Sequence, residues 1–290
     1  MINFFIAYRL VFDLFLIHAG LAYSQYVVLR TGAFSVAVPG LAAIGAYCAA
    51  ILTVRHAVHP LVAVAAATVI GTVVSLLLSL PLARLRGVYQ AIASLAFVQI
   101  VLSLNLYAQD LTGGAMGFTG IPKLVDTAEL VAGLVVVLYV IASIDATRLG
   151  RSFDAIRQDE AVAASLGISV TRHQMAAFAV SGAIAGLFGA LEAFHGYALE
   201  PNQFGFGLLI TILTYVVFGG RRSVAGPLVG TAILVALPEL ARPMQENRLL
   251  VYGLLMMAVI AFLPRGVYDT LRDWLRHRRL AARDTARARS

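Results

Sequence analysis

Apolar residues fill most of this chain in long continuous runs that short polar stretches separate. Each run is close to the roughly 20 residues that a helix needs to cross a bilayer. The runs do not alternate between apolar and polar positions, which excludes the strands of a membrane barrel. We therefore predict an all-α fold, a polytopic membrane helix bundle with about 8–10 transmembrane segments. The runs lie near residues 4–29, 33–54, 60–83, 89–108, 128–147, 174–196, 204–219, 223–241 and 247–264.

Two of these runs are interrupted or short. Pro39 and Gly40 lie within the 33–54 run, and the run that begins at Phe204 is brief. Non-helical backbone is tolerated at membrane depth where protein surrounds it. We expect broken or re-entrant helices at both places, so the number of spans depends on whether 33–54 crosses fully.

Small residues recur at four-residue spacing in three runs, which places them on one face of each helix. Such positions let helix backbones approach closely inside a membrane. We expect tightly packed helix seams there, with close packing as their main role. The positions are Gly71, Ser75, Ser79, Gly182, Gly186, Gly226 and Gly230.

One charged stretch, from Arg151 to Gly167, has the pattern of a short amphipathic helix. Asp154 and Arg157 are three residues apart and are expected to pair. Gly167 is a typical helix-ending residue. A solvated connector or a helix that lies on lipid would have the same pattern. The residues expected on the apolar side are Ala155, Ile156, Val162 and Leu166.

Charged residues inside or at the ends of apolar runs are costly and mark candidate functional positions. Arg9 and Asp13, four residues apart, are expected to pair with each other. Asp145 is expected to pair with Arg148 at the end of its run. Three further charged positions are Glu192, His195 and Glu239. Their presence is explained equally well by solvation at the level of the lipid headgroups and by a role in a solute path.

Composition agrees with a membrane protein, since 60% of the residues are hydrophobic, only 13% are charged and the mean hydropathy is +0.85. The first apolar run lacks a basic leader and a small-residue cleavage site, so we interpret it as an uncleaved span. The single cysteine, Cys48, lies in an apolar run and is expected to be a packing residue.

Arginine sets the expected orientation, because positive charge is retained in short cytoplasmic loops. The 151–167 helix and the C-terminus are then cytoplasmic, and nine spans put the N-terminus outside. The basic tail would rest on anionic membrane lipid, and positive-inside topology explains the tail without nucleic acid. The outward loops are 109–127, 197–203 and 242–248, and the arginine groups are Arg84 with Arg86, Arg148 with Arg151, Arg157 and Arg172, Arg221 with Arg222, and the tail from Arg265 to Arg289.

Motifs for enzymatic chemistry are missing from the sequence. The only lysine, Lys123, is followed by Leu124 and Val125, so the chain has no phosphate-binding loop. It also has no zinc-protease motif or serine nucleophile elbow. We therefore expect no catalytic or metal-binding residue in this chain, and energy for any active process must come from other proteins.

Four segments, spread over nearly the whole chain, together form a specific pattern. They are GAFSVAVPGLAAIGAY (Gly32–Tyr47); LRGVYQAIASLAFVQI (Leu85–Ile100) leading into LTGGAMGFTGIP (Leu111–Pro122); GRSFDAIRQDEAVAASLGI (Gly150–Ile168) followed by AFAVSGAIAGLFGAL (Ala177–Leu191); and FGGRRSVAGPLVG (Phe218–Gly230) with FLPRGV (Phe262–Val267). In order and spacing they resemble the permease subunits of ATP-binding-cassette importers for branched-chain amino acids, and the LivM-type subunit in particular. The first segment is similar to that family's GxxSxGxxxFxxxGAY.

This resemblance implies that residues 151–168 form a cytoplasmic coupling helix within a transmembrane permease domain, 1–265, which a basic cytoplasmic tail, 266–290, follows. The helix would dock on an ATP-binding subunit and transmit its closure to the spans. Residues that match the family pattern and are expected to carry the coupling are Arg157, Asp159, Glu160 and Gly167. Candidate polar groups of the solute pathway in the matching segments are Ser35, Tyr47, Tyr89, Gln90, Ser94, Gln99 and Thr112.

The resemblance also implies partners: two cytoplasmic ATP-binding subunits that bind ATP and Mg, a second, LivH-like permease subunit, and an extracytoplasmic solute-binding protein. This chain would bind no cofactor and would lie, multi-pass, in a bacterial cytoplasmic (inner) membrane. Arg221 and Arg222 stand where the family usually has a Gly-rich turn, and Ala37 and Val38 where it has Gly-His. These departures leave the solute open.

Three functions are therefore weighed. The first is the permease subunit of an importer for branched-chain amino acids or similar small polar solutes, with urea and short amides as alternative solutes. The second is a self-sufficient secondary transporter or channel, which would depend on a proton or sodium gradient. The third is a purely structural membrane subunit, in which substitutions along the pathway would be silent.

Overall fold

The computed structural model describes residues 2–240, 257 and 266–270 of the chain, and it consists almost entirely of helix in these residues. The chain divides into two compact units, Met1–Leu213 and Thr214–Ser290. The predicted run 247–264, apart from residue 257, and the predicted tail beyond residue 270 lie outside the described residues. The predicted division into 1–265 and 266–290 therefore stays a prediction.

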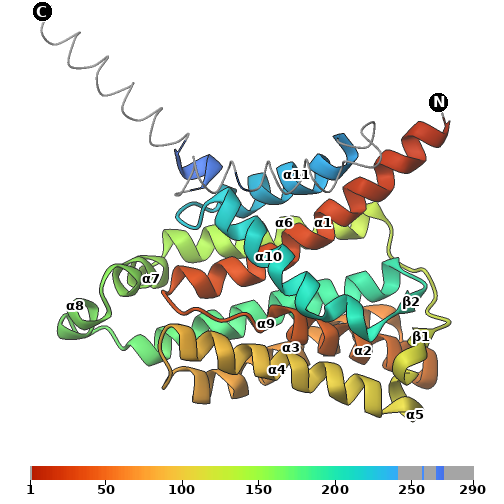
Figure 1. Cartoon of the computed structure of the whole chain (residues 1–290), viewed down its shortest axis with the longest axis horizontal. Helices are drawn as coiled ribbons and strands as arrows, with labels where there is room; N and C mark the ends of the chain where they lie inside the picture. Colours follow the sequence, from red (N-terminus) through yellow and green to blue (C-terminus); the bar gives the residue numbers. More distant parts are fainter. Residues whose placement is uncertain (1, 241–256, 258–265, 271–290) are drawn as a thin grey trace, which may run out of the picture. The chain divides into compact units, whose positions relative to one another are not determined.

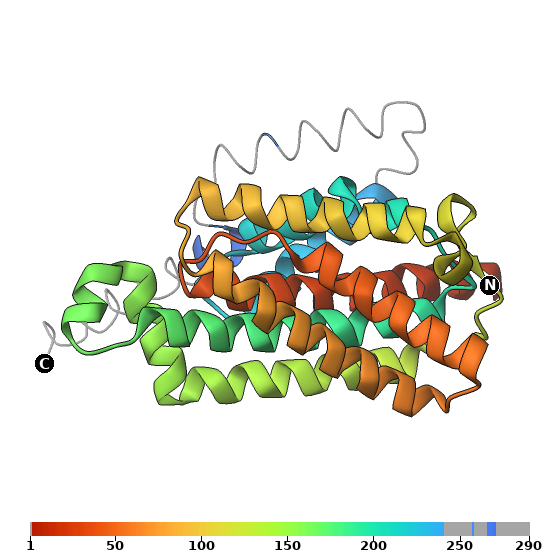
Figure 2. The same ribbon diagram turned by 90° about the horizontal axis from the view of Figure 1, so that it is seen from below.

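Helices of the first unit form the bundle in Figures 1 and 2. They are α1 (Ile2–Arg30), α2 (Val38–His56), α3 (Pro60–Leu82), α4 (Val88–Tyr107), α5 (Gln109–Thr112), α6 (Thr127–Ala146), α7 (Arg148–Gln158), α8 (Glu160–Ser165) and α9 (Val170–His195), with the short 3-10 turns η1 (Gly114–Met116) and η2 (Pro201–Phe204). The chain continues through α10 (Phe206–Gly219) to α11 (Ala225–Leu240) in the second unit.

Seven helices of the described residues are long and apolar enough to cross a membrane, and Ala225–Pro238 is a shorter apolar helix. The prediction of an all-α polytopic membrane bundle is thus confirmed. The spans are Arg9–Arg30, Val38–His56, Pro60–Leu82, Val88–Tyr107, Thr127–Ala146, Val170–His195 and Pro201–Gly219.

The helix α9 lies at the centre of the first unit, where it packs against α1, α2 and α3 (Figures 1 and 2). Glycines bring the backbones into contact: a Cβ on Gly186 would lie 2.5 Å from the Ala67 carbonyl oxygen of α3. A Cβ on Gly45 of α2 would lie 2.5 Å from the Gly186 carbonyl oxygen. Ser75 adds a hydrogen bond from its hydroxyl to the Phe178 carbonyl, at 2.6 Å. The predicted close seams are therefore confirmed in this unit.

The second unit has its own close contact. A Cβ on Gly230 of α11 would meet the backbone of Gly219, 2.8 Å from its Cα, so the predicted small-residue contact is found here too. The turn after α10 is fixed by a carboxylate, because buried Asp269 accepts a hydrogen bond from the Arg222 backbone N–H at 3.0 Å.

The first unit has two distinct ends (Figure 1). At one end β1 (Phe118–Thr119) pairs antiparallel with β2 (Ala198–Leu199), near α5. We call this the β end; it joins the predicted outward loops 109–127 and 197–203, whereas 242–248 lies outside the described residues. At the other end lie α7 and α8, and we call it the α7–α8 end.

Candidate functional site

The predicted amphipathic helix is two helices in the structure, α7 and α8, and the prediction of one continuous helix from Arg151 is wrong. The chain breaks at Asp159, whose backbone is extended with φ −159° and ψ 115°. The Asp159 carboxylate accepts hydrogen bonds from the backbone N–H groups of Ala161 and Val162, at 2.8 and 3.1 Å. Aspartate is a preferred cap at a helix N-terminus, which explains why a new helix starts there.

The predicted shared apolar side is divided by this break. Ile156 of α7 is buried at 1% exposure together with Phe153, whereas Val162 and Leu166 are 55% and 73% exposed. Helical spacing does not continue through an extended residue, so the two halves face different surroundings. The α7 half anchors the element on the bundle, where the Phe153 ring meets the His173 ring of α9 edge-on, and the α8 half leaves apolar side chains uncovered.

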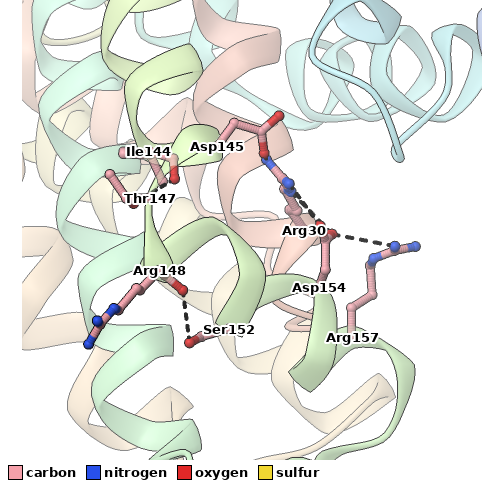
Figure 3. Close-up of polar contacts among 8 residues, drawn as sticks. All are labelled: Arg30, Ile144, Asp145, Thr147, Arg148, Ser152, Asp154 and Arg157. Carbon is pink, nitrogen blue, oxygen red and sulfur yellow. Dashed lines mark hydrogen bonds and ion pairs between the residues drawn. The ribbon is translucent and has the colours of Figure 1, made fainter.

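A cluster of charged side chains joins α7 to the spans (Figure 3). We call it the Arg30 cluster; it consists of Arg30, Asp145, Asp154 and Arg157. The Arg30 guanidinium, at the end of α1, pairs with Asp145 of α6 and with Asp154 of α7, the latter at 3.0 Å. Asp154 also pairs with Arg157 at 3.5 Å, as predicted from their spacing. The expected partner of Asp145 was Arg148, which is wrong: Arg148 points away from the cluster in Figure 3.

All four predicted coupling residues lie at the α7–α8 end, and each has a role within the chain. Arg157 lies against the turn after α1, because a Cβ on Gly32 would be 3.4 Å from the Arg157 Cα. Asp159 caps α8, and Gly167 adopts φ +81° where the chain leaves α8. Glu160 pairs with Arg86, 3.6 Å away, from the loop before α4.

Three predicted pathway residues meet around the extended segment that joins α1 to α2. This segment lies just before Pro39, so the non-helical backbone is found a few residues earlier than the predicted break, and α2 is continuous from Val38 to His56. Gln90 accepts a hydrogen bond from the Phe34 N–H at 2.8 Å and donates one to the Leu82 carbonyl at 3.2 Å. Ser94 accepts one from the Val36 N–H at 2.9 Å. The third residue, Ser35, belongs to the segment itself. These bonds satisfy backbone groups that a bilayer leaves without partners.

The other four predicted pathway residues lie apart from that segment. Tyr47 donates a hydrogen bond to the Leu199 carbonyl at 3.4 Å, and Thr112 donates one to the Asn105 carbonyl at 2.5 Å. Tyr89 and Gln99 lie on the exposed face of α4, with Tyr89 74% exposed. The structure therefore brings the seven residues together only in part.

The charged residues near the β end pair differently from the prediction. Arg9 pairs with Asp126 at 3.1 Å, and Asp13 pairs with His195 of α9 at 3.7 Å, so the predicted Arg9 to Asp13 pair is wrong. Asp13 is 3% exposed and faces protein. The Glu239 side chain lies outside the described residues. In the part of the chain that the structure describes, no three His, Cys, Asp or Glu side chains could hold a metal ion.

Sequence reasoning missed Arg30 and Gln25. Gln25 of α1 donates a hydrogen bond to the Ser35 carbonyl at 2.5 Å and completes the polar cradle around the extended segment. Gln25 is a polar residue near the end of the apolar 4–29 run and Arg30 directly follows that run, which is the only signal that the sequence offers. That signal is weak because interfacial polar residues commonly end a span.

Known proteins are similar to this chain over most of its length. Residues 10–260 match the family model described as the branched-chain amino acid transport system / permease component. The branched-chain amino acid permease protein LivM of Salmonella typhimurium is 32% identical over 86% of this chain and 67% of its own length, and that of Escherichia coli K12 is 32% identical over 89% and 68%. The ribose import permease protein RbsC of Escherichia coli K12 is 27% identical over 75% and 72%.

No solved structure matches the chain. The family match covers most of the chain, and the LivM relatives are similar over nearly the same length. These findings also agree with the multi-pass helical bundle. The chain therefore belongs to the branched-chain amino acid transport permease family of ATP-binding-cassette importers.

Proposed function

We propose that this chain and a second, LivH-like permease subunit together enclose the translocation path of an importer that two cytoplasmic ATP-binding subunits drive. The observation that carries the proposal is the divided α7–α8 element. Its α7 half is anchored by buried Phe153 and Ile156, and its α8 half presents Val162 and Leu166 to the surroundings. An anchored element with an exposed apolar end is suited to receive another protein.

Orientation follows from charge. Arg86 and Arg157 lie at the α7–α8 end, which the positive-inside rule assigns to the cytoplasm. We therefore propose that the α7–α8 end and the C-terminus face the cytoplasm of a bacterial cell, across its cytoplasmic membrane. ATP and Mg then belong to the partner subunits, and a solute-binding protein delivers the solute at the β end.

The proposed solute is a branched-chain amino acid. The support is that the two LivM relatives, whose names specify this solute, are similar over most of the chain. Uptake of labelled leucine should depend on this chain and should be inhibited by valine and isoleucine. Inhibition by urea or acetamide instead, without inhibition by valine, would move the assignment to short amides.

The proposal that an ATP-binding subunit docks on the exposed α8 half is tested by replacing Val162 and Leu166 with Asn in the tagged chain. The proteins that co-purify from the native host in mild detergent are then identified by mass spectrometry. We expect the wild type to recover a Walker-motif ATPase and a second permease, and the double variant to lose only the ATPase. A matched control replaces two exposed apolar residues of the β end, Met116 and Leu124, with Asn; it should retain both partners.

Two results would contradict the proposal in different ways. If the double variant retains the ATPase, the subunit docks elsewhere on the chain. If the wild type recovers no ATPase at all, the importer assignment fails, and a self-sufficient secondary transporter becomes the better explanation.

A further inference from the structure

We infer that Arg30 is the positioning residue that makes α7 move together with α1 and α6 when the ATP-binding subunit moves α8. The inference rests on the proposed function and goes further, because it names the group inside the permease that passes the motion on. Arg30 lies in no predicted coupling set and would not itself touch solute or ATP.

The first support is the geometry of the charges (Figure 3). Arg30 donates to both carboxylate oxygens of Asp154, with Nη2 to Oδ2 at 3.0 Å and Nε to Oδ1 at 3.4 Å. Its Nη1 pairs with Asp145. A planar guanidinium with five donors can hold two carboxylates at fixed angles, which an ammonium group cannot do. One side chain therefore ties α1 to both α6 and α7.

Burial makes this link strong. The Arg30 side chain is only 6% exposed, whereas Asp145 and Asp154 are 35% and 39% exposed. A buried cation without its partners is costly, so α7 cannot leave Arg30 without a large penalty. The Arg30 side chain also lines a small pocket together with Ile141 and Phe153. The two carboxylates orient its guanidinium.

Close backbone packing keeps α7 aligned with its neighbours. A Cβ on Gly150 of α7 would lie 2.7 Å from the Ile144 carbonyl oxygen and 2.8 Å from the Asp145 Cα, both in α6. On the other side, Arg157 lies against Gly32, which has φ +79° and directly precedes the extended segment. A shift of α7 therefore presses on α6 and on the start of that segment at once.

The extended segment continues the route toward the spans. It begins three residues after Arg30, and its backbone is held by Gln90 and Ser94 of α4. Motion of α7 thus reaches α1 and α6 through Arg30, and α4 through the segment. An ion pair that only stabilised the fold would not need to connect these particular elements, and the two roles differ in a measurable way.

The test measures solute transported per ATP hydrolysed. The complex that co-purifies with the tagged chain is reconstituted in proteoliposomes with its solute-binding protein, using the wild type, Asp154→Asn and Arg30→Lys. The matched control is Arg148→Ala, because Arg148 is an exposed arginine of the same helix that points away from the cluster. Subunit composition is measured for each sample.

We expect both cluster variants to assemble with their ATPase and to hydrolyse ATP at a rate comparable to wild type. Solute per ATP should fall at least about fivefold, the lower end of typical coupling between sites. Arg148→Ala should keep the wild-type ratio. Arg30→Lys should lose less than Asp154→Asn, because lysine keeps the charge and can pair with one carboxylate.

The inference is overturned if uptake and hydrolysis fall by the same factor, because the cluster then only stabilises the complex. Loss of assembly in both variants would likewise assign the cluster a purely structural role. Absence of an ATPase from the wild-type complex would instead refute the proposed function itself, so the two failures are distinguishable.

Discussion

Two regions of the first unit are held together mainly by different means. In the seam of α2, α3 and α9, glycines bring backbones within contact, and Ser75 adds a hydrogen bond to the Phe178 carbonyl. At the α7–α8 end, Gly150 also packs closely on α6, but polar side chains form most of the connections described above. They are the Arg30 cluster, the Gln90 and Ser94 bonds to the extended segment, and the exposed pair of Arg86 and Glu160.

The two regions differ in how far their helices can shift without losing their contacts. Close backbone contact offers one arrangement, because any shift of α9 either opens a void or creates a clash. Ion pairs and hydrogen bonds act over a wider range of positions than such contacts do. The seam is therefore suited to be the fixed frame of the bundle, and the α7–α8 end is suited to transmit movement.

The largest predicted effect is on the seam. Gly186→Leu should reduce the free energy of unfolding by about 3 kcal/mol or prevent folding, because its side chain would enter the backbone of α3. Gly207→Leu is the matched control, since a Cβ there meets nothing within 4 Å. Thermal stability in detergent, followed by fluorescence-detected size-exclusion chromatography, should separate the two. Equal stability of both variants would show that the seam tolerates bulk.

A smaller effect is predicted at Gln90, which binds the backbone of the extended segment. Gln90→Ala should lower stability by about 1–2 kcal/mol, because the Phe34 N–H loses its acceptor in a part-buried place and the Leu82 carbonyl loses its donor. Uptake should fall as well, since the extended segment loses its support. Gln99→Ala, on the exposed face of the same helix, should leave the melting temperature unchanged. If Gln99→Ala abolishes uptake and Gln90→Ala does not, the solute path lies along the exposed face.

The smallest effect is predicted for the exposed pair. Arg86→Ala should change stability by no more than about 0.5 kcal/mol, because Arg86 is 86% exposed and its 3.6 Å pair with Glu160 is screened by water and salt. The melting curve of this variant should coincide with that of the wild type, both at low salt and at high salt. A loss near that of Gln90→Ala would mean that the surface pair supports the element more than its exposure indicates.

Much of the fold could be predicted from the chain alone. Runs of apolar residues locate spans because a bilayer requires continuous helices. Small residues at four-residue spacing located the seam, since Gly182 and Gly186 share a helix face. The length of the α7–α8 element was found within a few residues, but its break at Asp159 was missed: a capping aspartate also fits the charged face of a continuous helix.

The candidate site could be predicted less well, because pairing between distant residues has no local signal. Arg9 and Asp13 are correctly spaced to pair on one helix, yet each has a partner from another element, Asp126 and His195 respectively. The same holds for Asp145, whose partner Arg30 is more than a hundred residues away. Which coupling and pathway residues act in transport stays a prediction.

The break at Asp159 has a consequence for how this chain can change over time. Because α7 is tied to the bundle and α8 is capped separately, substitutions in α8 can accumulate without disturbing the buried charges. If α8 receives the ATP-binding subunit as proposed, such a permease could acquire a different ATP-binding partner by altering six residues, Glu160–Ser165, and their neighbour Leu166. The same segment would then be the natural exchange point for building chimeric importers.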